Sequence, residues 1–253
     1  MSKPFEGKVA LVTGGNSGIG KATAILFAAQ GARVVIAARR APEGEATVAE
    51  IRRSGGEAIF VKTDVMQAAD AEAVVRKAVE EYGRLDCAFN NAGVSGGGPL
   101  HEITEPDWDR MIDVNLKGVW LGMKYQIIQM LSQGGGGAIV NDSSVAGLTG
   151  YVRSAAYCAS KHGVIGLTKA GALQYRDKGI RINAVCPGMI MTPMIERAFA
   201  IPGVEDWFRS KVAGRGGNPD EVAQAVTWLC SDAASYLTGV ALPVDGGLSS
   251  GLS

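Results

Sequence analysis

The stretch Thr13-Gly14-Gly15-Asn16-Ser17-Gly18-Ile19-Gly20 decides the fold. It follows a short apolar run, Lys8–Thr13, that predicts a strand, and it opens a helical pattern that spans Gly18–Gln30. Glycines between a strand and a helix permit a tight turn and let backbone amides approach a pyrophosphate, which the positive end of the helix then favours. An ordinary turn is the alternative, but this position in the chain favours a dinucleotide-binding loop.

The alternation of strand and helix continues along the chain. Short β-branched runs alternate with longer helical patterns, without an internal repeat or a Pro- or Ser-rich linker. This alternation predicts an α/β fold of the Rossmann type, a doubly wound parallel sheet with helices on both faces. Seven strands are expected, at Lys8–Thr13, Arg33–Ala38, Ala58–Lys62, Cys87–Asn90, Ala138–Asp142, Ile180–Cys186 and Ala241–Val244.

Glycines stand where predicted helices end, as expected for left-handed caps. Three helices are expected to stop before Gly31, Gly83 and Gly179, and they span Gly18–Gln30, Ala68–Tyr82 and Ser154–Lys178. The last helix opens with Asn218-Pro219-Asp220-Glu221, which combines a capping side chain, a proline in the first turn and two acids near the positive end of the helix dipole.

The length of 253 residues suits a single NAD(P)-binding domain over residues 1–253. The segment 189–217 breaks the rhythm of the pattern, because it is long and weakly periodic, which is typical of a lid over a substrate site. Packing against the body of the protein, or across a subunit contact, explains its apolar side chains as well as a pocket wall does. These side chains are Met189, Met191, Met194, Phe199, Trp207 and Phe208.

Charge and hydropathy exclude several classes of protein. The 25 basic residues balance the 25 acidic ones, and no long run of Lys or Arg indicates nucleic acid or an anionic membrane surface as a partner. No secretory signal is visible, and no apolar stretch approaches the roughly 20 residues of a membrane-spanning helix. We expect a soluble, cytoplasmic protein.

The cysteines and histidines do not predict a metal site or a disulfide. Cys87, Cys158, Cys186 and Cys230 are widely spaced, and the two histidines of the chain form no short ligand cluster with them. We expect the four thiols to be small residues of the core, with Cys158 at the wall of the site.

The end of the second strand indicates which dinucleotide binds. A chain that binds NAD usually carries an Asp or Glu there, which accepts a hydrogen bond from the ribose 2′-hydroxyl. Here the residues are Ala37-Ala38-Arg39-Arg40. Two guanidinium groups can bind a 2′-phosphate and no carboxylate repels it, which favours NADP(H) over NAD(H). Two solvated arginines, with NAD(H) as the cofactor, are the alternative.

Two further stretches follow strands in the same way. Asp64-Val65 follows the third strand, and Asn90-Asn91-Ala92-Gly93 follows the fourth. Asp64 could accept a hydrogen bond from the adenine amine, and the small Ala92-Gly93 pair could let the sugars of the cofactor lie against the backbone. A turn or a helix cap explains each stretch equally well.

The candidate catalytic pair lies in Tyr157-Cys158-Ala159-Ser160-Lys161, where a phenol and an ammonium four residues apart share one face of a predicted helix. A tyrosine ordinarily titrates near pH ~10, and a neighbouring cation favours its ionised form. Tyr157 could therefore carry a proton to or from a substrate oxygen, while a nicotinamide carries the hydride. An exposed Tyr/Lys pair is the alternative, so the context of the pair decides.

That context is a common position at the carboxyl ends of predicted strands, where open parallel sheets bind ligands. Ser144 lies just past the fifth strand, where its hydroxyl could bind a substrate carbonyl. Asn115 lies among apolar neighbours in the helix after the fourth strand, where a satisfied core amide is the plain explanation. The features at strand ends are the glycine-rich loop, Arg39, Asp64, Asn91–Gly93, Ser144 and Pro187-Gly188.

These motifs together resemble those of the short-chain dehydrogenase/reductase family. The resemblance covers practically the whole chain and rests on Thr-Gly-x3-Gly-x-Gly, Asn-Asn-Ala-Gly, Asn115, Ser144, Tyr157-x3-Lys161, Pro187-Gly188 and Val244-Asp245-Gly246-Gly247. It implies that Tyr157 is the acid/base and that Ser144 orients the reacting oxygen. It implies further that Lys161 also holds the nicotinamide ribose and that Asn115 supports a water-linked proton relay.

The resemblance also implies a cofactor site and an assembly. Asn91 would lie near the central sugars of the cofactor, and Ile190 and Thr192 near the nicotinamide amide. A homotetramer is expected, with a dimer as the alternative. The residues expected to bind the cofactor are Gly14, Asn16, Ser17, Gly18, Ile19, Gly20, Arg39, Arg40, Asp64, Val65, Asn91, Ala92, Gly93, Tyr157, Lys161, Pro187, Gly188, Ile190 and Thr192.

The expected reaction is NAD(P)(H)-dependent hydride transfer between a secondary alcohol and a ketone. The longer epimerases and dehydratases of the family need an additional C-terminal region, and its enoyl-reducing branch spaces the Tyr and Lys more widely. A non-catalytic NAD(P)-binding regulator is the alternative, and it would be expected to lack Ser144, Tyr157 or Lys161, all of which are present.

Overall fold

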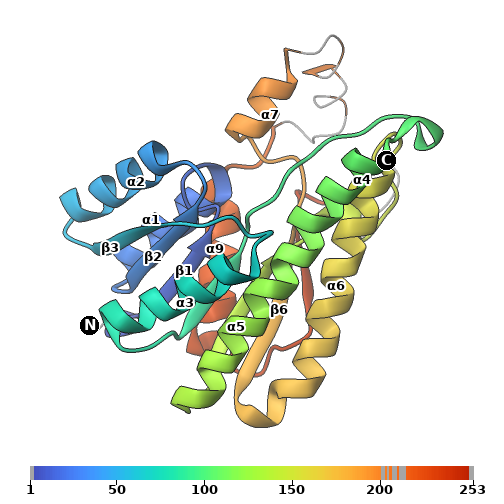
Figure 1. Cartoon of the computed structure of the whole chain (residues 1–253). Helices are drawn as coiled ribbons and strands as arrows, with labels where there is room; N and C mark the ends of the chain where they lie inside the picture. The colour runs from blue at the N-terminus through green and yellow to red at the C-terminus, as the bar shows by residue number, and fades with distance from the viewer. Residues whose placement is uncertain (1–2, 201–202, 204, 207–209, 211–214, 251–253) are drawn as a thin grey trace.

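A parallel sheet of seven strands in the order β3-β2-β1-β4-β5-β6-β7 forms the centre of the molecule, seen in a computed structural model (Figure 1). The structure describes residues 3–200, 203, 205–206, 210 and 215–250. All seven predicted strands are confirmed, with some ends displaced by one residue. The strands are β1 (Val9–Thr13), β2 (Arg33–Ala38), β3 (Glu57–Lys62), β4 (Cys87–Asn90), β5 (Gly137–Asp142), β6 (Ile180–Pro187) and β7 (Ala241–Val244).

The displaced ends follow the register of neighbouring strands rather than the apolar pattern. Glu57 starts β3 because it pairs with Arg33 of β2, although its side chain is exposed. Pro187 ends β6, where it pairs with Val244. A strand therefore extends as far as its partner does, which the side chains alone do not reveal.

Helices cover both faces of the sheet, as the sequence predicted (Figure 1). Successive residues of β1 face opposite sides: Ala10 and Val12 belong to one buried apolar cluster, and Val9 and Leu11 to the other. Three helices pack into the first cluster: α1 (Gly18–Ala29), α2 (Ala41–Arg53) and α9 (Pro219–Cys230). Three pack into the second: α3 (Ala68–Tyr82), α5 (Gly118–Gln133) and α6 (Ala155–Tyr175).

The predicted helix caps are present, with small shifts. Gly83 closes α3 in the left-handed conformation, at φ 84°. Helix α6 ends at Tyr175, earlier than predicted, because a 3₁₀ turn over Arg176–Lys178 follows it before left-handed Gly179. At the start of α9, the Glu221 carboxylate accepts a hydrogen bond of 2.8 Å from the Asn218 amide and so forms part of a capping box.

The segment 189–217 leaves the sheet and returns to it. Ile190 and Gly217 form a parallel bridge at its base, and the Met191 amide donates to the Gly217 carbonyl at 2.8 Å. Between them, helix α7 (Pro193–Ala198) rises above the carboxyl edge of the sheet (Figure 1). Of the apolar residues predicted in this segment, Trp207, Phe208 and the Met194 side chain lie outside the described part of the structure.

No helix among the described residues is long and apolar enough to span a bilayer. All four cysteines are free thiols: Cys87, Cys186 and Cys230 are buried, and Cys158 is partly buried. Within the described ranges, no group of three or more His, Cys, Asp or Glu side chains is arranged to hold a metal ion.

The packing of α1 against the sheet predicts a large effect of Phe27→Ala. The Phe27 ring is fully buried and meets Phe5 edge-on, with ring centroids 5.0 Å apart. We expect its truncation to lower the free energy of unfolding by about 3–5 kcal/mol, through lost burial and a residual cavity. Urea denaturation at matched protein concentration measures the change. Leu100→Ala is the control, since Leu100 is 72% exposed; equal losses in the two variants would contradict this role of the Phe27 ring in the core.

Candidate active site

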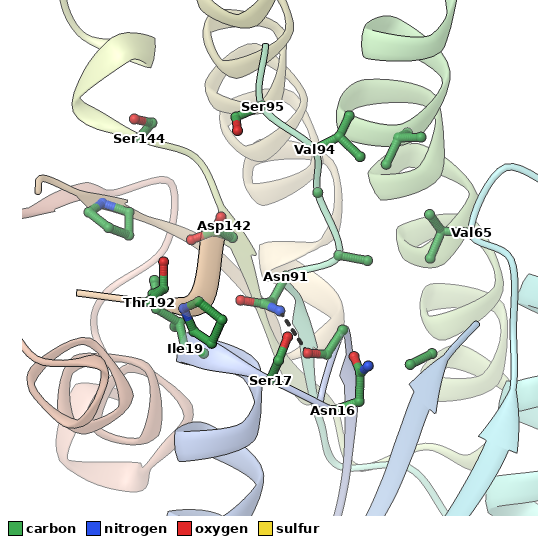
Figure 2. Close-up of a pocket in the computed structure, with 18 of the residues that line it drawn as sticks. Asn16, Ser17, Ile19, Val65, Asn91, Val94, Ser95, Asp142, Ser144 and Thr192 are labelled. Carbon is green, nitrogen blue, oxygen red and sulfur yellow. Dashed lines mark hydrogen bonds between the residues drawn. The ribbon is translucent and has the colours of Figure 1, made fainter. Parts of the chain in front are cut away.

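A cavity of about 600 Å³ opens at the carboxyl edge of the sheet, and it brings together nearly every residue that the sequence singled out. Figure 2 shows side chains from several segments facing it, among them Ser17, Asn91, Ser144 and Thr192. The predicted residues that line it are Gly14, Asn16, Ser17, Gly18, Ile19, Arg39, Arg40, Asp64, Val65, Asn91, Ala92, Gly93, Ser144, Tyr157, Lys161, Pro187, Gly188, Ile190 and Thr192. Two other predicted residues, Gly20 and Asn115, do not line the cavity.

The glycine-rich turn joins β1 to α1 and is shaped by three glycines. Gly14 and Gly18 have φ angles of 67° and 53°, in the left-handed region where a side chain is strained. Gly20 does not line the cavity but lets the helix pack closely, because a methyl group there would collide with the Gly14 carbonyl and the Asn91 amide. The loop therefore presents bare backbone and the N-terminus of α1 to the cavity, a cradle suited to a pyrophosphate.

Hydrogen bonds between β1 and β4 hold this turn in place. The Thr13 hydroxyl accepts from the backbone amides of Asn91 and Ala92, at 2.9 and 3.1 Å. The Asn91 side-chain amide donates to the Thr13 carbonyl at 2.9 Å. It also donates to the Gly14 carbonyl at 3.4 Å, the bond dashed in Figure 2. Asn91 thus fastens the loop, a role that the sequence did not reveal because its partners are 77 and 78 residues away.

The two arginines after β2 differ in their surroundings. Both are exposed at the rim of the cavity. The Arg40 guanidinium forms an ion pair with Glu43 one turn into α2, at 2.9 Å, whereas Arg39 makes no ion pair with any residue that the structure describes. The Asp64 carboxylate accepts from the Met66 amide at 3.1 Å, so it serves the turn before α3 as well as lining the cavity. The Arg39 guanidinium has no partner among the described residues, so all its donors are open to a ligand.

At the opposite end of the cavity, α6 supplies Tyr157 and Lys161. They lie one helical turn apart, and the Lys161 ammonium lies 5.7 Å from the centre of the Tyr157 ring. Tyr157 is partly buried, while Lys161 is only 3% exposed. The predicted pair therefore faces the cavity and is not an exposed pair on a helix surface.

Asp142, the last residue of β5, is the counter-ion of Lys161. The Lys161 ammonium donates to the Asp142 carbonyl at 2.7 Å and to its carboxylate Oδ2 at 3.1 Å. Burial lowers the pKa of Lys161, but Asp142 and Tyr157 overcome this effect and the pKa is raised. Burial also raises the pKa of Asp142, and Lys161 offsets part of that shift. The lysine is thus held as a cation.

The sequence interpretation missed Asp142. The one signal that could have found it was an acid at the end of a buried strand, two residues before Ser144. Burying a carboxylate in a parallel sheet that is covered on both faces is costly unless a cation or a ligand pairs with it.

The segment after β5 places two serines with different tasks. Ser143 is 1% exposed, and its hydroxyl donates to the Lys161 carbonyl at 2.9 Å, which ties β5 to α6. Ser144 lines the cavity, and its Oγ accepts from the Ala146 amide at 3.1 Å in the 3₁₀ turn Val145–Gly147. This bond leaves the Ser144 hydroxyl hydrogen available to a substrate oxygen.

Asn115 lies in a π-helical turn, Asp113–Lys117, between α4 (Glu105–Ile112) and α5. Its side chain is 1% exposed and bonds both ways with the Val94 backbone: Oδ1 accepts at 2.8 Å and Nδ2 donates at 2.9 Å. Nδ2 also lies 3.3 Å from the Ser160 hydroxyl. The satisfied core amide considered from the sequence is therefore present, and it holds the loop after β4 against α6. A π turn inside a helix often marks a functional position.

The residues after β6 close the cavity from a third side. Pro187 ends β6, and the amide of the next residue, Gly188, donates to the Val244 carbonyl at 3.1 Å. Ile190 is buried at the base of the segment 189–217, and the Thr192 hydroxyl accepts from the Ile195 amide at 3.4 Å. Beside them, burial raises the pKa of the Cys186 thiol to about 11, so this thiol is not a nucleophile.

The cavity fits an extended dinucleotide. A phosphate cradle lies at the glycine-rich turn, a free guanidinium at Arg39, and the Tyr157–Lys161 pair at the far end. The Asp142 Oδ1 atom is buried in the wall without a hydrogen-bond partner among the described residues, which suits a donor on a bound molecule. An extended dinucleotide bound along these features would have its reacting end beside Ser144 and Tyr157.

Comparison with known proteins agrees with this geometry. A family model described as Enoyl-(Acyl carrier protein) reductase matches residues 14–249. The cyclohexanol dehydrogenase of Acinetobacter sp. strain SE19 is 46% identical over 251 residues, which cover 99% of this chain and 98% of that protein.

Two solved structures are similar over nearly their whole length. The crystal structure of levodione reductase has a TM-score of 0.94 and 37% identity, covering 98% of this chain and 100% of that one. A putative 2-deoxy-D-gluconate 3-dehydrogenase from Agrobacterium tumefaciens with bound NADP has a TM-score of 0.88 and 37% identity, covering 98% and 99%. With these relatives, the chain belongs to the short-chain dehydrogenase/reductase family, as an NAD(P)-dependent oxidoreductase that acts on CH–OH and carbonyl groups rather than as a regulator.

Proposed function

We propose that this protein interconverts a cyclic secondary alcohol and the corresponding ketone with NADP(H), using Tyr157 as the acid/base. One observation carries the proposal: Tyr157 and the buried Lys161 cation face the same cavity as Ser144, at the end opposite Arg39 and the glycine-rich turn. The ring in the substrate is supported by the similarity to a cyclohexanol dehydrogenase.

The bound nicotinamide would supply or accept the hydride. In the direction of oxidation, the Tyr157 oxygen takes the proton of the substrate hydroxyl, and in the direction of reduction it returns one to the carbonyl oxygen. The Lys161 ammonium lies 5.7 Å from the centre of the Tyr157 ring and so supplies positive charge beside the proton carrier. The Ser144 hydroxyl donates a hydrogen bond to the reacting oxygen and so holds it within reach of Tyr157.

The remaining site residues have supporting roles in this proposal. Lys161 also binds the nicotinamide ribose, and Asn115 supports a water-linked relay that exchanges the proton of Tyr157 with solvent. Ile190 and Thr192 contact the nicotinamide amide. The turn Gly14–Gly20 binds the pyrophosphate, Asp64 and Val65 lie at the adenine, and Asn91, Ala92 and Gly93 lie against the sugars.

The acid/base role predicts that Tyr157→Phe lowers kcat for cyclohexanol oxidation by about 10³-fold, since the ring keeps its shape but loses its proton carrier. The dissociation constant for the cofactor should change by less than about threefold, because the hydroxyl serves the substrate. Absorbance of the reduced cofactor follows turnover, and its fluorescence follows binding. Tyr175→Phe, at the other end of α6, is the matched control and should stay active. Turnover of Tyr157→Phe at the wild-type rate would refute the role.

NADP(H) is the proposed cofactor because of the charges after β2. The chain has Ala37 and Ala38 at the strand end in place of an acid, and the free Arg39 guanidinium can bind a 2′-phosphate through paired hydrogen bonds. Arg40 contributes less, since Glu43 already pairs with it. The similar dehydrogenase with bound NADP supports this choice.

Arg39→Ala should therefore weaken NADP(H) selectively. We expect its KM for NADP to rise about tenfold, through the loss of charge-assisted hydrogen bonds, while its KM for NAD stays nearly constant. Steady-state kinetics with both cofactors measures the effect. Arg53→Ala, at the C-terminal end of α2, removes an exposed arginine away from the cavity and is the control. A wild-type preference for NAD, or an equal loss for both cofactors, would contradict the assignment.

The segment 189–217 is proposed as the substrate lid of a single domain that spans residues 1–253. The bridge between Ile190 and Gly217 gives the segment a narrow base, and Pro193 and Ile195 of α7 line the cavity. An apolar ring could pack beneath it while its hydroxyl points to Tyr157 and Ser144.

We also place the protein in the cytoplasm, since its four cysteines are free thiols and a reducing compartment keeps them so.

A homotetramer is the proposed assembly, and the exposed face of α5 supports it. Trp120, Ile128 and Leu131 lie at helical spacing and are 46%, 53% and 43% exposed. Leu173 of α6, 67% exposed, belongs to the same side of the sheet (Figure 1). Apolar side chains gathered on one face indicate a contact surface between subunits.

A charge in this face should weaken the assembly. We expect Ile128→Glu to shift the protein from tetramer to a smaller species, because four buried carboxylates without partners oppose association. Size-exclusion chromatography with light scattering gives the mass. Leu100→Glu, at a more exposed apolar position outside this face, is the control and should remain tetrameric. A monomeric wild-type protein, or an unchanged mass for Ile128→Glu, would contradict the proposal.

A further inference from the structure

Asp142 has a carboxylate oxygen that neither the fold nor the proposed mechanism uses. It ends β5 inside the cavity, and Figure 2 shows its side chain in the space shared with Asn91 and Thr192. Oδ2 accepts from the Lys161 ammonium, whereas Oδ1 is buried and has no hydrogen-bond partner among the described residues. A buried carboxylate oxygen without a donor is costly, so its retention indicates a donor or a charge on a bound molecule.

The need to anchor Lys161 does not explain this carboxylate. The shorter of the two bonds from the Lys161 ammonium, 2.7 Å, goes to the Asp142 backbone carbonyl, which any residue at this position would offer. The Ser143 hydroxyl further ties the backbone of Lys161 to β5. What the side chain of Asp142 adds is a negative charge 3.1 Å from the ammonium, in the wall of the cavity.

A charge at this place acts on the two redox forms of a nicotinamide differently. The oxidised ring carries a positive charge and the reduced ring is neutral. With Lys161 alone, the cavity would hold an uncompensated cation beside the reacting end, which opposes the oxidised ring. With Asp142 the pair is neutral, and the carboxylate that balances the charge lies in the wall of the cavity.

We propose that Asp142 is a charge-balancing residue that lets the site hold the oxidised, positively charged nicotinamide next to Lys161, with Oδ1 accepting a hydrogen bond from the cofactor. The inference rests on the proposed function, since it requires a nicotinamide at this end of the cavity. A nicotinamide nucleotide offers donors of two kinds here, the ribose hydroxyls and the carboxamide NH₂. The hydrogen bond stabilises both redox forms when they are bound, whereas the charge stabilises only the oxidised form.

The test compares the dissociation constants of the two redox forms in Asp142→Asn, which keeps the shape of the side chain and removes its charge. Titration with NADPH is followed by nucleotide fluorescence, and NADP⁺ is measured by displacement of NADPH. We expect the ratio of the constants, oxidised over reduced, to rise about tenfold. Asp64→Asn is the matched control: it removes a carboxylate from the same cavity at the proposed adenine end, and its ratio should equal that of the wild type.

Each outcome bears on the inference. A ratio for Asp142→Asn within about twofold of the wild-type value would overturn it, and so would an equal rise in Asp64→Asn. Both constants come from one preparation, so an unfolded fraction does not alter their ratio. Asp142→Ser, which loses both charge and reach, provides a second variant and should show the same rise. A wild-type protein that binds neither form would overturn the proposed function itself, whereas normal binding with an unchanged ratio overturns only the role of Asp142.

Discussion

The parallel pairing of β1 between β2 and β4 is the constraint on which the site depends. Thr13, the last residue of β1, lies in register with Ala37 of β2 and Asn90 of β4. Three strands that are distant in sequence therefore end at one edge, and the loops that leave them meet at the cavity. The Thr13 hydroxyl accepts hydrogen bonds from two backbone amides of the segment after β4. These bonds hold that segment against the end of β1.

Burial of the Lys161 ammonium is the second constraint, and it is electrostatic. Exposed ion pairs of this protein, such as Arg76 with Glu80 on α3, contribute only about 0–1 kcal/mol each, because water screens them. A cation that is 3% exposed is different, since removing its counter-ion typically costs about 3–5 kcal/mol. The end of β5 therefore completes the sheet and also places a negative charge 3.1 Å from the Lys161 ammonium.

The site thus combines elements that are hydrogen-bonded to one another with an excursion whose two ends pair with each other. Asn91 binds the glycine-rich turn to the segment after β4, and hydrogen bonds of Ser143 and Lys161 bind the end of β5 to α6. The two ends of the segment 189–217 pair with each other through the bridge between Ile190 and Gly217. The hydrogen-bonded elements hold the proposed acid/base and the proposed phosphate site, and the excursion above them is where relatives of one family can differ in substrate.

The sequence by itself determined the sheet, the glycine-rich turn and the face shared by Tyr157 and Lys161. These features come from local rules: the spacing of apolar residues, the conformations open to glycine, and the four-residue repeat of a helix. Only the tertiary structure decided that Asp142 is the counter-ion of Lys161, that Asn115 bonds to Val94 in a π turn, and that Arg40, unlike Arg39, is engaged by Glu43. The first two depend on contacts between residues 19 and 21 positions apart, which no periodicity along the chain records. The third depends on the side-chain rotamers at the end of β2 and the start of α2.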